Sequence, residues 1–152
     1  MAEYIALTQN VPINQPVVFD ASIPCNRGLV IHDDGTGIFI LRGVVNNQNA
    51  CFTRYAITFN GNIAIPEGSA EIGAIAISLA VNGESRPSSK AIVTPAAVNE
   101  FFNVTSTAIV TIPRGCCFSV SVRAVPASDD PTVTPVPILT VSNGNLEITR
   151  VA

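Results

Sequence analysis

Residues 51–61, CFTRYAITFNG, and residues 74–83, AIAISLAVNG, decide the fold class. In both stretches large apolar side chains alternate with smaller or polar ones, which is the pattern of a β-strand with one face in a core. Both stretches end in Asn-Gly, the preferred sequence of a two-residue hairpin turn. We therefore expect two core strands that end in tight turns at Asn60-Gly61 and Asn82-Gly83.

The flanking sequence repeats this pattern of short apolar runs and turn residues. Strand-like runs surround the stretch from Asp33 to Gly37, which predicts a hairpin. The run from Val104 to Ile112 is mostly β-branched, and the proline-rich stretch from Ala124 to Pro137 predicts a surface loop. Asn143-Gly144 predicts a last turn. The fold class we expect is all-β, an antiparallel sandwich of about 8–10 strands without helices.

The composition limits the classes of partner. A chain of 152 residues suits one domain, and its charged fraction of 12% is about half of what soluble domains usually carry. The net charge of -3 offers no basic surface for nucleic acid and no polybasic segment for anionic lipid. We therefore expect no nucleic-acid partner, and we expect subunits to cover part of each other's weakly charged surface.

Targeting signals are equally sparse. The stretch Met1 to Tyr4 has an acid where a signal peptide needs bases. The longest apolar run, from Ile72 to Val81, is about half the ~20 residues of a spanning helix. We expect synthesis in the cytoplasm and no membrane partner.

Residue types that catalyse reactions or bind metals are few and scattered. His32 is the only histidine, and we expect it to face solvent beside a hairpin turn without a catalytic role. No motif for nucleophilic, phosphate-binding or zinc chemistry occurs, so we expect no enzyme, no catalytic residues and no cofactor. The acidic pairs Asp33-Asp34 and Asp129-Asp130 leave a loop-bound calcium ion as an open alternative.

The four cysteines, Cys25, Cys51, Cys116 and Cys117, lack the spacing of a metal site. The simplest interpretation is that they are small, buried and reduced. A Cys25–Cys51 bridge, or a bridge between subunits through Cys116 or Cys117, stays an alternative for a particle that matures in an oxidising environment.

The order of segments in the second half resembles a known superfamily. Arg54 to Phe59 is followed by Ile75 to Leu79, the Val81-Asn82-Gly83 turn, Ile109 to Gly115 and Leu146 to Ile148. This order, over roughly residues 50–151, resembles the tumour necrosis factor/complement-head superfamily. The resemblance implies a jelly-roll sandwich that assembles as a compact homotrimer and has no catalytic activity. Arg114-Gly115 stands where the superfamily usually has a Gly-Asp turn.

The first half is similar to small proteins of phages and prophages of gut Firmicutes, through Pro24 to Gly28 and the Asp33–Gly37 hairpin. Similar heads occur at the tips of spore-surface collagen-like proteins. The resemblance implies a structural virion protein made in the host cytoplasm, either a capsid decoration or a head fibre. The alternatives are a spore or cell-surface tip protein and a trimeric module that binds a glycan or receptor through the Ala124–Pro137 loop.

We divide the chain into an N-terminal docking or edge segment, residues 1–20, and a jelly-roll domain, residues 21–152. The expected docking residues are Tyr4, Ile5, Leu7, Val17 and Phe19. Their strands could equally add to a sheet of their own or a neighbouring subunit. The residues we expect in the trimer interface are Ala74, Ala76 and Ala80, whose small side chains admit a close neighbour, with the aromatic Tyr55 and Phe118.

Overall fold

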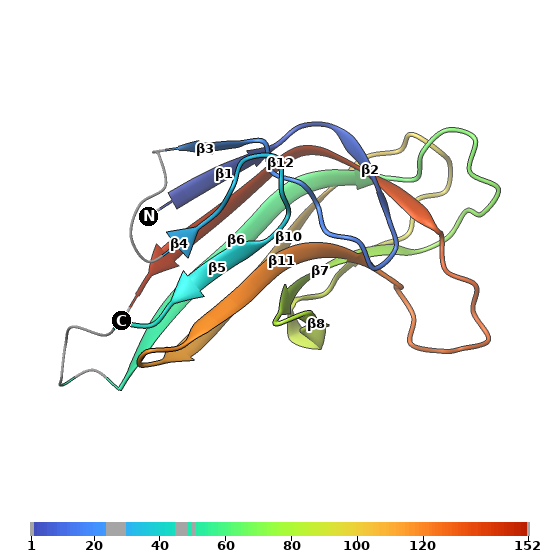
Figure 1. The fold of residues 1–152 in the computed structure, drawn as a ribbon. Coiled ribbons are helices and arrows are strands. Elements are labelled where there is room, and N and C mark those ends of the chain that lie inside the picture. The colour runs from blue at the N-terminus through green and yellow to red at the C-terminus, as the bar shows by residue number, and fades with distance from the viewer. Residues whose placement is uncertain (1, 24–29, 45–48, 50, 152) are drawn as a thin grey trace.

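The computed structural model describes residues 2–23, 30–44, 49 and 51–151, which form a two-layer antiparallel β-sandwich (Figure 1). Sheet A runs in the order β10 (Phe102–Pro113), β6 (Phe52–Ala64), β12 (Ile138–Arg150), β1 (Ala2–Ala6) and β3 (Ala21–Ile23), and β2 (Gln9–Pro12) also pairs with β12. Sheet B runs in the order β4 (Val30–Ile31), β5 (Phe39–Arg42), β11 (Cys117–Val125), β7 (Ile75–Val81) and β8 (Glu84–Ser85), and β9 (Ala91–Val93) also pairs with β7.

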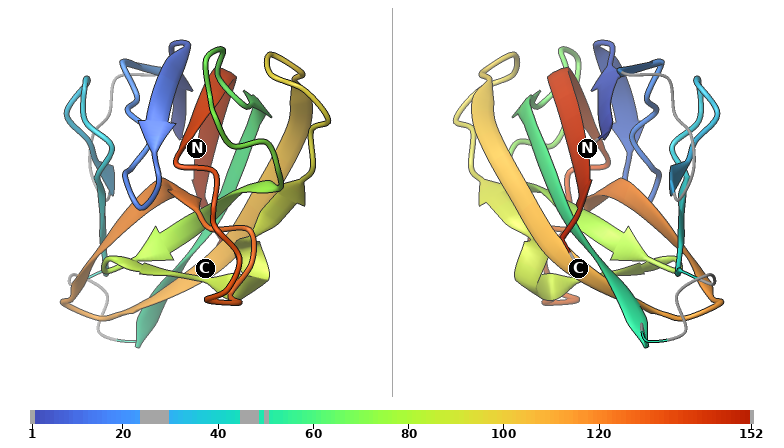
Figure 2. Two further views of the ribbon diagram at one scale, coloured as in Figure 1. Left: turned by 90° about the vertical axis from the view of Figure 1, so that its right-hand side faces the viewer. Right: turned by 90° about the vertical axis from the view of Figure 1, so that its left-hand side faces the viewer.

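The all-β sandwich is confirmed. The described residues contain twelve strands and one short 3₁₀ helix, η1 (Pro87–Ser89). The higher strand number arises because short pieces such as β4 and β8 extend the edges of sheet B. The end-on views of Figure 2 show the two layers with the long strands of sheet A on one side.

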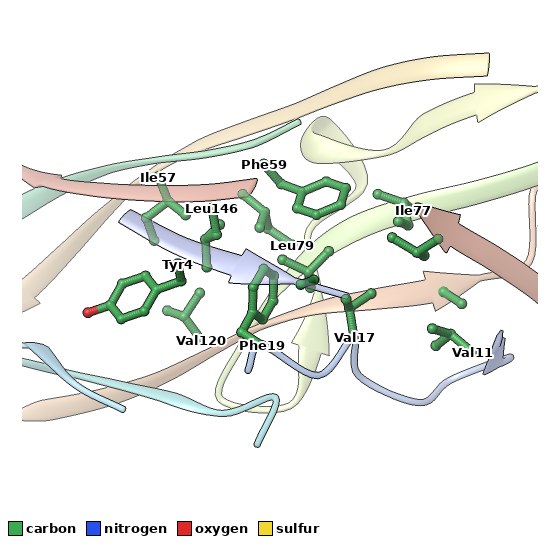
Figure 3. Packing of buried hydrophobic residues seen from close by; sticks show 14 of the residues in the cluster. Tyr4, Val11, Val17, Phe19, Ile57, Phe59, Ile77, Leu79, Val120 and Leu146 are labelled. Atoms are coloured by element: carbon green, nitrogen blue, oxygen red, sulfur yellow. The ribbon is translucent and has the colours of Figure 1, made fainter. Parts of the chain in front are cut away.

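Alternate side chains of both sheets meet in one apolar core (Figure 3). Phe19, Phe39, Phe59 and Tyr4 are fully buried in its centre. The rings of Tyr4 and Phe39 lie 4.6 Å apart and those of Phe19 and Phe39 lie 5.3 Å apart, both edge to face. This geometry is the favourable one for aromatic pairs, so these rings stabilise the sandwich beyond the area that they bury.

Two of the three predicted Asn-Gly turns lie inside strands instead. Asn82-Gly83 forms the expected hairpin turn between β7 and β8, with positive φ at both residues. Asn60-Gly61 continues β6, and Asn143-Gly144 lies at a register shift within β12 between Ser142 and Asn145. The prediction of turns at these two sites was therefore wrong.

Close packing around Phe59 explains both glycines. A Cβ atom on Gly61 would lie 2.9 Å from Phe59 Cζ and 3.3 Å from Gly144 Cα. A Cβ atom on Gly144 would lie 3.0 Å from the Cβ atom of Ala6. The glycines are thus needed because the buried ring and the neighbouring strands occupy the space of a side chain.

The N-terminal segment is part of the sandwich. β1 pairs with β12 on one side and β3 on the other. The chain between β2 and β3 then crosses to sheet B, where Val17 N–H donates to the Val122 carbonyl oxygen at 2.7 Å. Residue 20 is therefore not a boundary between two separately packed parts of the chain. β1 and β2 add to sheet A of their own subunit, which was one of the two alternatives expected for this segment.

The edge of sheet B beside sheet A is closed by the segment from β8 to β9. Between the two strands Ser89 is buried, and its hydroxyl oxygen accepts a hydrogen bond from the Leu79 N–H at 3.0 Å. The Ser106 hydroxyl of β10 donates to the Ser89 carbonyl oxygen. The Leu79 N–H has no backbone partner in the gap between β8 and β9, and the Ser89 hydroxyl oxygen takes that place. Through the bond from Ser106, Ser89 also links this edge of sheet B to sheet A.

We expect Gly61→Ala to lower the free energy of unfolding by about 1–3 kcal/mol, the usual cost of overpacking a core. Gly73→Ala is the matched control, because its Cβ would meet only Val136 Cγ2, at 3.9 Å. Urea denaturation of both variants measures the difference. Equal stability of the two variants would contradict the close packing around Phe59.

Candidate interaction surface

The outer surface of β10 and β6 is a broad polar face of sheet A. Side chains at alternate positions point away from the core and are exposed or half-buried. We call this set the Asn/Thr face; it consists of Asn103, Thr105, Thr107, Ile109 and Thr111 from β10 and Ala56, Thr58, Asn60 and Asn62 from β6. Ile109 is 60% exposed in the single chain.

Side-chain hydrogen bonds fix one part of this face. The Asn60 amide donates to Thr105 Oγ1 at 2.8 Å and to Asn103 Oδ1 at 3.2 Å. The Asn103 amide donates back to Asn60 Oδ1 at 3.1 Å and to Asn62 Oδ1 at 3.2 Å. These cross-strand bonds hold the amide groups in place before any partner arrives, which lowers the entropic cost of binding.

The Asn/Thr face carries no ionisable side chain. Outward positions of antiparallel sheets normally carry polar and charged groups. The charged neighbours of this face are Arg54 of β6, opposite Thr111, and Glu147 of β12, opposite Thr58. Depletion of charge with one central apolar side chain is typical of the buried part of a protein interface. The face is thus suited to direct contact with another protein surface.

The residues predicted for the trimer interface lie elsewhere. Ala76, Ala80 and Tyr55 are 0%, 0% and 1% exposed within one chain, so they cannot contact a neighbour, and this part of the expectation is corrected. Tyr55 points into the core, and the two alanines are shielded by strands and loops of their own subunit. Ala74 and Phe118 are half-buried, and for them the interface stays a prediction.

The predicted docking residues divide in the same way. Tyr4, Val17 and Phe19 are fully buried core residues, which corrects their assignment as docking side chains. Ile5 is half-buried on the outer side of β1, and Leu7 is 64% exposed. Only these two remain available for contact with a particle.

Sequence reasoning missed the Asn/Thr face because Asn60-Gly61 was interpreted as a turn. A signal was present in the alternation of Asn103, Thr105, Thr107, Ile109 and Thr111 along one strand. Such alternation without a single charge is unusual for a solvent-facing strand surface.

His32 is enclosed rather than solvent-facing, which corrects the expectation. Its side chain is 0% exposed and stacks on the Phe39 ring at 4.1 Å. Its Nε2 atom lies 2.9 Å from the Thr36 carbonyl oxygen, and Nδ1 lies 3.8 Å from Asp34 Oδ1. His32 therefore belongs to the aromatic cluster of Tyr4, Phe19 and Phe39.

The three described cysteines are exposed and free, so their expected burial was wrong. Cys51 precedes β6, and Cys116 and Cys117 follow the Arg114-Gly115 turn, where Gly115 has φ of 78°. The Arg114 N–H donates to the Cys51 carbonyl oxygen at 3.0 Å, so the two segments meet at one end of the sandwich. Cys25 and its proposed bridge to Cys51 lie outside the described residues.

The acidic pairs lie on surface loops. Asp130 accepts hydrogen bonds from the Thr132 N–H and hydroxyl at 2.9 and 2.8 Å, and these bonds lower the pKa of its carboxyl group. Within the described residues, no three His, Cys, Asp or Glu side chains are grouped as a metal site would require. Over the same residues, no helix is long and apolar enough to cross a membrane.

Comparison with solved structures defines the fold further. The globular domain of zebrafish complement 1qA protein matches with a TM-score of 0.56 and 14% identity, over 95% of this chain and 92% of that domain. The chain has the jelly-roll fold of a complement 1q head. The C-terminal domain of EclA, a sugar-binding protein, matches with a TM-score of 0.35 and 18% identity, over 83% of this chain and 86% of that one. No protein-family model matches the sequence, and no curated protein matches it significantly.

The two tyrosines of the complement 1q-like core differ in their hydroxyl groups. Tyr55 donates to the Arg42 carbonyl oxygen at 2.6 Å, whereas the buried Tyr4 hydroxyl has no partner among the described residues. Burial, helped by the charge of Asp34, raises the pKa of Tyr4 to about 12. Burial also raises the pKa of Tyr55, against the opposing charge of Arg150.

We expect Tyr4→Phe to raise the free energy of unfolding by about 1 kcal/mol, because it removes an unpaired buried hydroxyl. The control Tyr55→Phe should lower it by about 1 kcal/mol, because it removes a hydrogen bond and leaves the Arg42 carbonyl oxygen unpaired. Urea denaturation at pH 7 measures both. A loss of stability in Tyr4→Phe would contradict the unpaired state of this hydroxyl.

The raised pKa of Tyr4 also predicts a pH dependence. An unfolded tyrosine ionises near 10, so the stability given by the neutral buried phenol is complete below pH 10 and is lost as the pH rises towards 12. Tyr4→Phe should make the decline of stability between pH 10 and 12 shallower than in the wild type. An identical decline in both proteins would contradict this assignment.

Proposed function

We propose that the protein is a non-enzymatic structural protein that acts as a homotrimer displayed on a particle, as a capsid decoration or head fibre of a bacteriophage. The observation that carries the proposal is the uncharged, internally hydrogen-bonded Asn/Thr face. A second copy is a suitable partner because most soluble oligomers are symmetric assemblies of one chain.

The composition of the surface supports self-association. The chain has only 12% charged residues, and eleven large apolar side chains are exposed among the described residues. Ile109, the most exposed apolar residue of the Asn/Thr face, would be removed from water by a neighbouring subunit. The polar amides around it would fix the register of the contact.

The surroundings of His32 support the non-enzymatic part of the proposal. A catalytic imidazole needs access to substrate as well as a neighbouring acid or nucleophile, and Asp34 alone does not provide that access. His32 instead packs between aromatic rings with its side chain fully buried. Its position is that of a core residue.

The arrangement of the chain ends supports display. Ala2 pairs with Ile148, so the first and last strands meet at one end of the sandwich (Figure 1). The loops at residues 65–74, 94–101 and 126–137 gather at the opposite end. A particle that holds the first end would present these loops to the surroundings. Leu7, which is exposed, and Ile5, which is half-buried, lie further along sheet A beside the middle of β12, and they are candidate contacts only for a particle that also covers that part of the sheet.

Static light scattering over a dilution series tests the assembly. We expect a mass three times that of the 15.9 kDa chain, stable to dilution. A mass of one chain at every concentration would overturn the homotrimer.

The variant Thr107→Arg tests the face. It places a guanidinium at the centre of an uncharged contact, where an unpaired charge is costly, so the trimer should dissociate. Thr134→Arg is the control, because Thr134 is exposed on the 126–137 loop away from this face. Both variants should keep the wild-type circular dichroism spectrum; a trimeric Thr107→Arg would exclude the Asn/Thr face as the interface.

Display is tested separately on particles purified by density gradient from lysates of the producing cells. Mass spectrometry should detect the protein in the fraction that contains capsids. Its recovery only in the particle-free fraction would contradict display while leaving the homotrimer intact.

A further inference from the structure

A small pocket lies on the outer side of sheet B, on the opposite sheet from the Asn/Thr face. Its volume is about 260 Å³, and it is lined from three directions. Ser78 of β7 belongs to the sheet, Arg86 and Lys90 flank η1, and Asn14 and Asp129 come from loops. The pocket is smaller than the sites of drug-sized ligands and suits a ligand of one sugar ring or less.

The Ser78 hydroxyl is a buried polar group without a partner. Its neighbours Ile77 and Leu79 point into the core, so the Ser78 side chain points to the opposite side of the sheet, towards the pocket. Ser78 is 1% exposed, and its Oγ atom has no hydrogen-bond partner among the described residues. An unpaired buried hydroxyl costs stability, so a bound group that pairs with it gains that energy.

The Lys90 ammonium is the second feature that indicates a ligand. Its side chain is 17% exposed, and its Nζ atom lies 3.7 Å from Asp129 Oδ1. Asp129 itself is fully exposed on its loop, and an ion pair of this kind contributes little stability. Lys90 thus has a mostly buried side chain whose ammonium lies against a carboxylate that is easily displaced.

The charge of the pocket selects the ligand. Arg86, which donates to the Ile109 carbonyl oxygen at 3.0 Å, adds a second positive charge to the wall. The two cations exceed the one acid, Asp129, in a protein of net charge -3. Lys90 is already paired with a carboxylate, that of Asp129. A ligand that displaces Asp129 would therefore present a carboxylate of its own.

We propose that this pocket binds a carboxylate carried on a small hydroxylated body, such as an acidic monosaccharide. The ligand carboxylate displaces Asp129 and pairs with Lys90, and a ligand hydroxyl pairs with Ser78. Asp129 acts as an internal competitor. The proposal does not rest on the proposed trimer, because Ser78, Lys90 and Asp129 are not part of the Asn/Thr face; Arg86, through its bond to Ile109, is the pocket residue that adjoins that face.

The test is a titration of the ¹⁵N-labelled full chain, followed by the backbone amide signals of Ser78 and Lys90. The probes are sodium glucuronate, neutral glucose and sodium acetate. We expect saturable shifts with glucuronate at a Kd on the order of 1 mM, the range for a ligand of this size. Glucose and acetate should bind at least five-fold more weakly.

Variants separate the contributions. Lys90→Met should weaken glucuronate binding at least ten-fold and Ser78→Ala about five-fold, because each removes one ligand contact. Asp129→Asn should tighten binding about two- to five-fold, because it removes the competitor. Glu67→Gln is its control, since it makes the same change in net charge at an exposed site outside the pocket and should leave the Kd unchanged.

Several outcomes would overturn the proposal. Absence of shifts at 100 mM glucuronate (roughly a hundred times the expected Kd) would exclude the site. Equal binding of acetate would exclude recognition of the hydroxylated body, and equal binding of glucose would exclude recognition of the carboxylate. Equal effects of Asp129→Asn and Glu67→Gln would exclude displacement of Asp129.

Discussion

The packing of the Phe59 ring against Gly61 and Gly144 is the contact on which the rest of the structure depends. It lets β6 and β12 run side by side past the register shift in β12, so that both strands extend over 13 residues. A long β6 in turn pairs with the whole of β10, and these two strands form the Asn/Thr face. The same ring lies 6.3 Å from Phe19, which joins sheet A to the aromatic cluster of the core.

The sequence pattern predicted the fold class because periodicity records which side chains face the core. Ile57, Phe59, Ile77 and Leu79 are buried as their alternation indicated. The pattern could not distinguish a turn from a close passage of strands, because glycine serves both, and so Asn60-Gly61 was misassigned. Nor could the pattern show whether the outer side of a strand is covered by its own chain or by a neighbouring subunit. Ala76 and Ala80 are small, but their own subunit already buries them.

The candidate sites were predicted less well than the fold, for a related reason. A site depends on which segments meet, and the segments that meet here lie far apart in the chain. Ser78, Lys90 and Asp129 share a pocket only because β7 lies beneath the loop that follows β11. The two sheets consequently have different roles in this account, with sheet A presenting a face to other copies of the chain and sheet B presenting a pocket to a small ligand.

Hydroxyl-radical footprinting of the assembled protein tests the central claim, that the outer face of sheet A is covered by a neighbouring copy. Ile109 on that face is 60% exposed in one chain, and Ile92 on the outer side of sheet B is 52% exposed. The account predicts strong protection of Ile109 and full reactivity of Ile92. Similar reactivity of both residues, or protection of Ile92 alone, would contradict it.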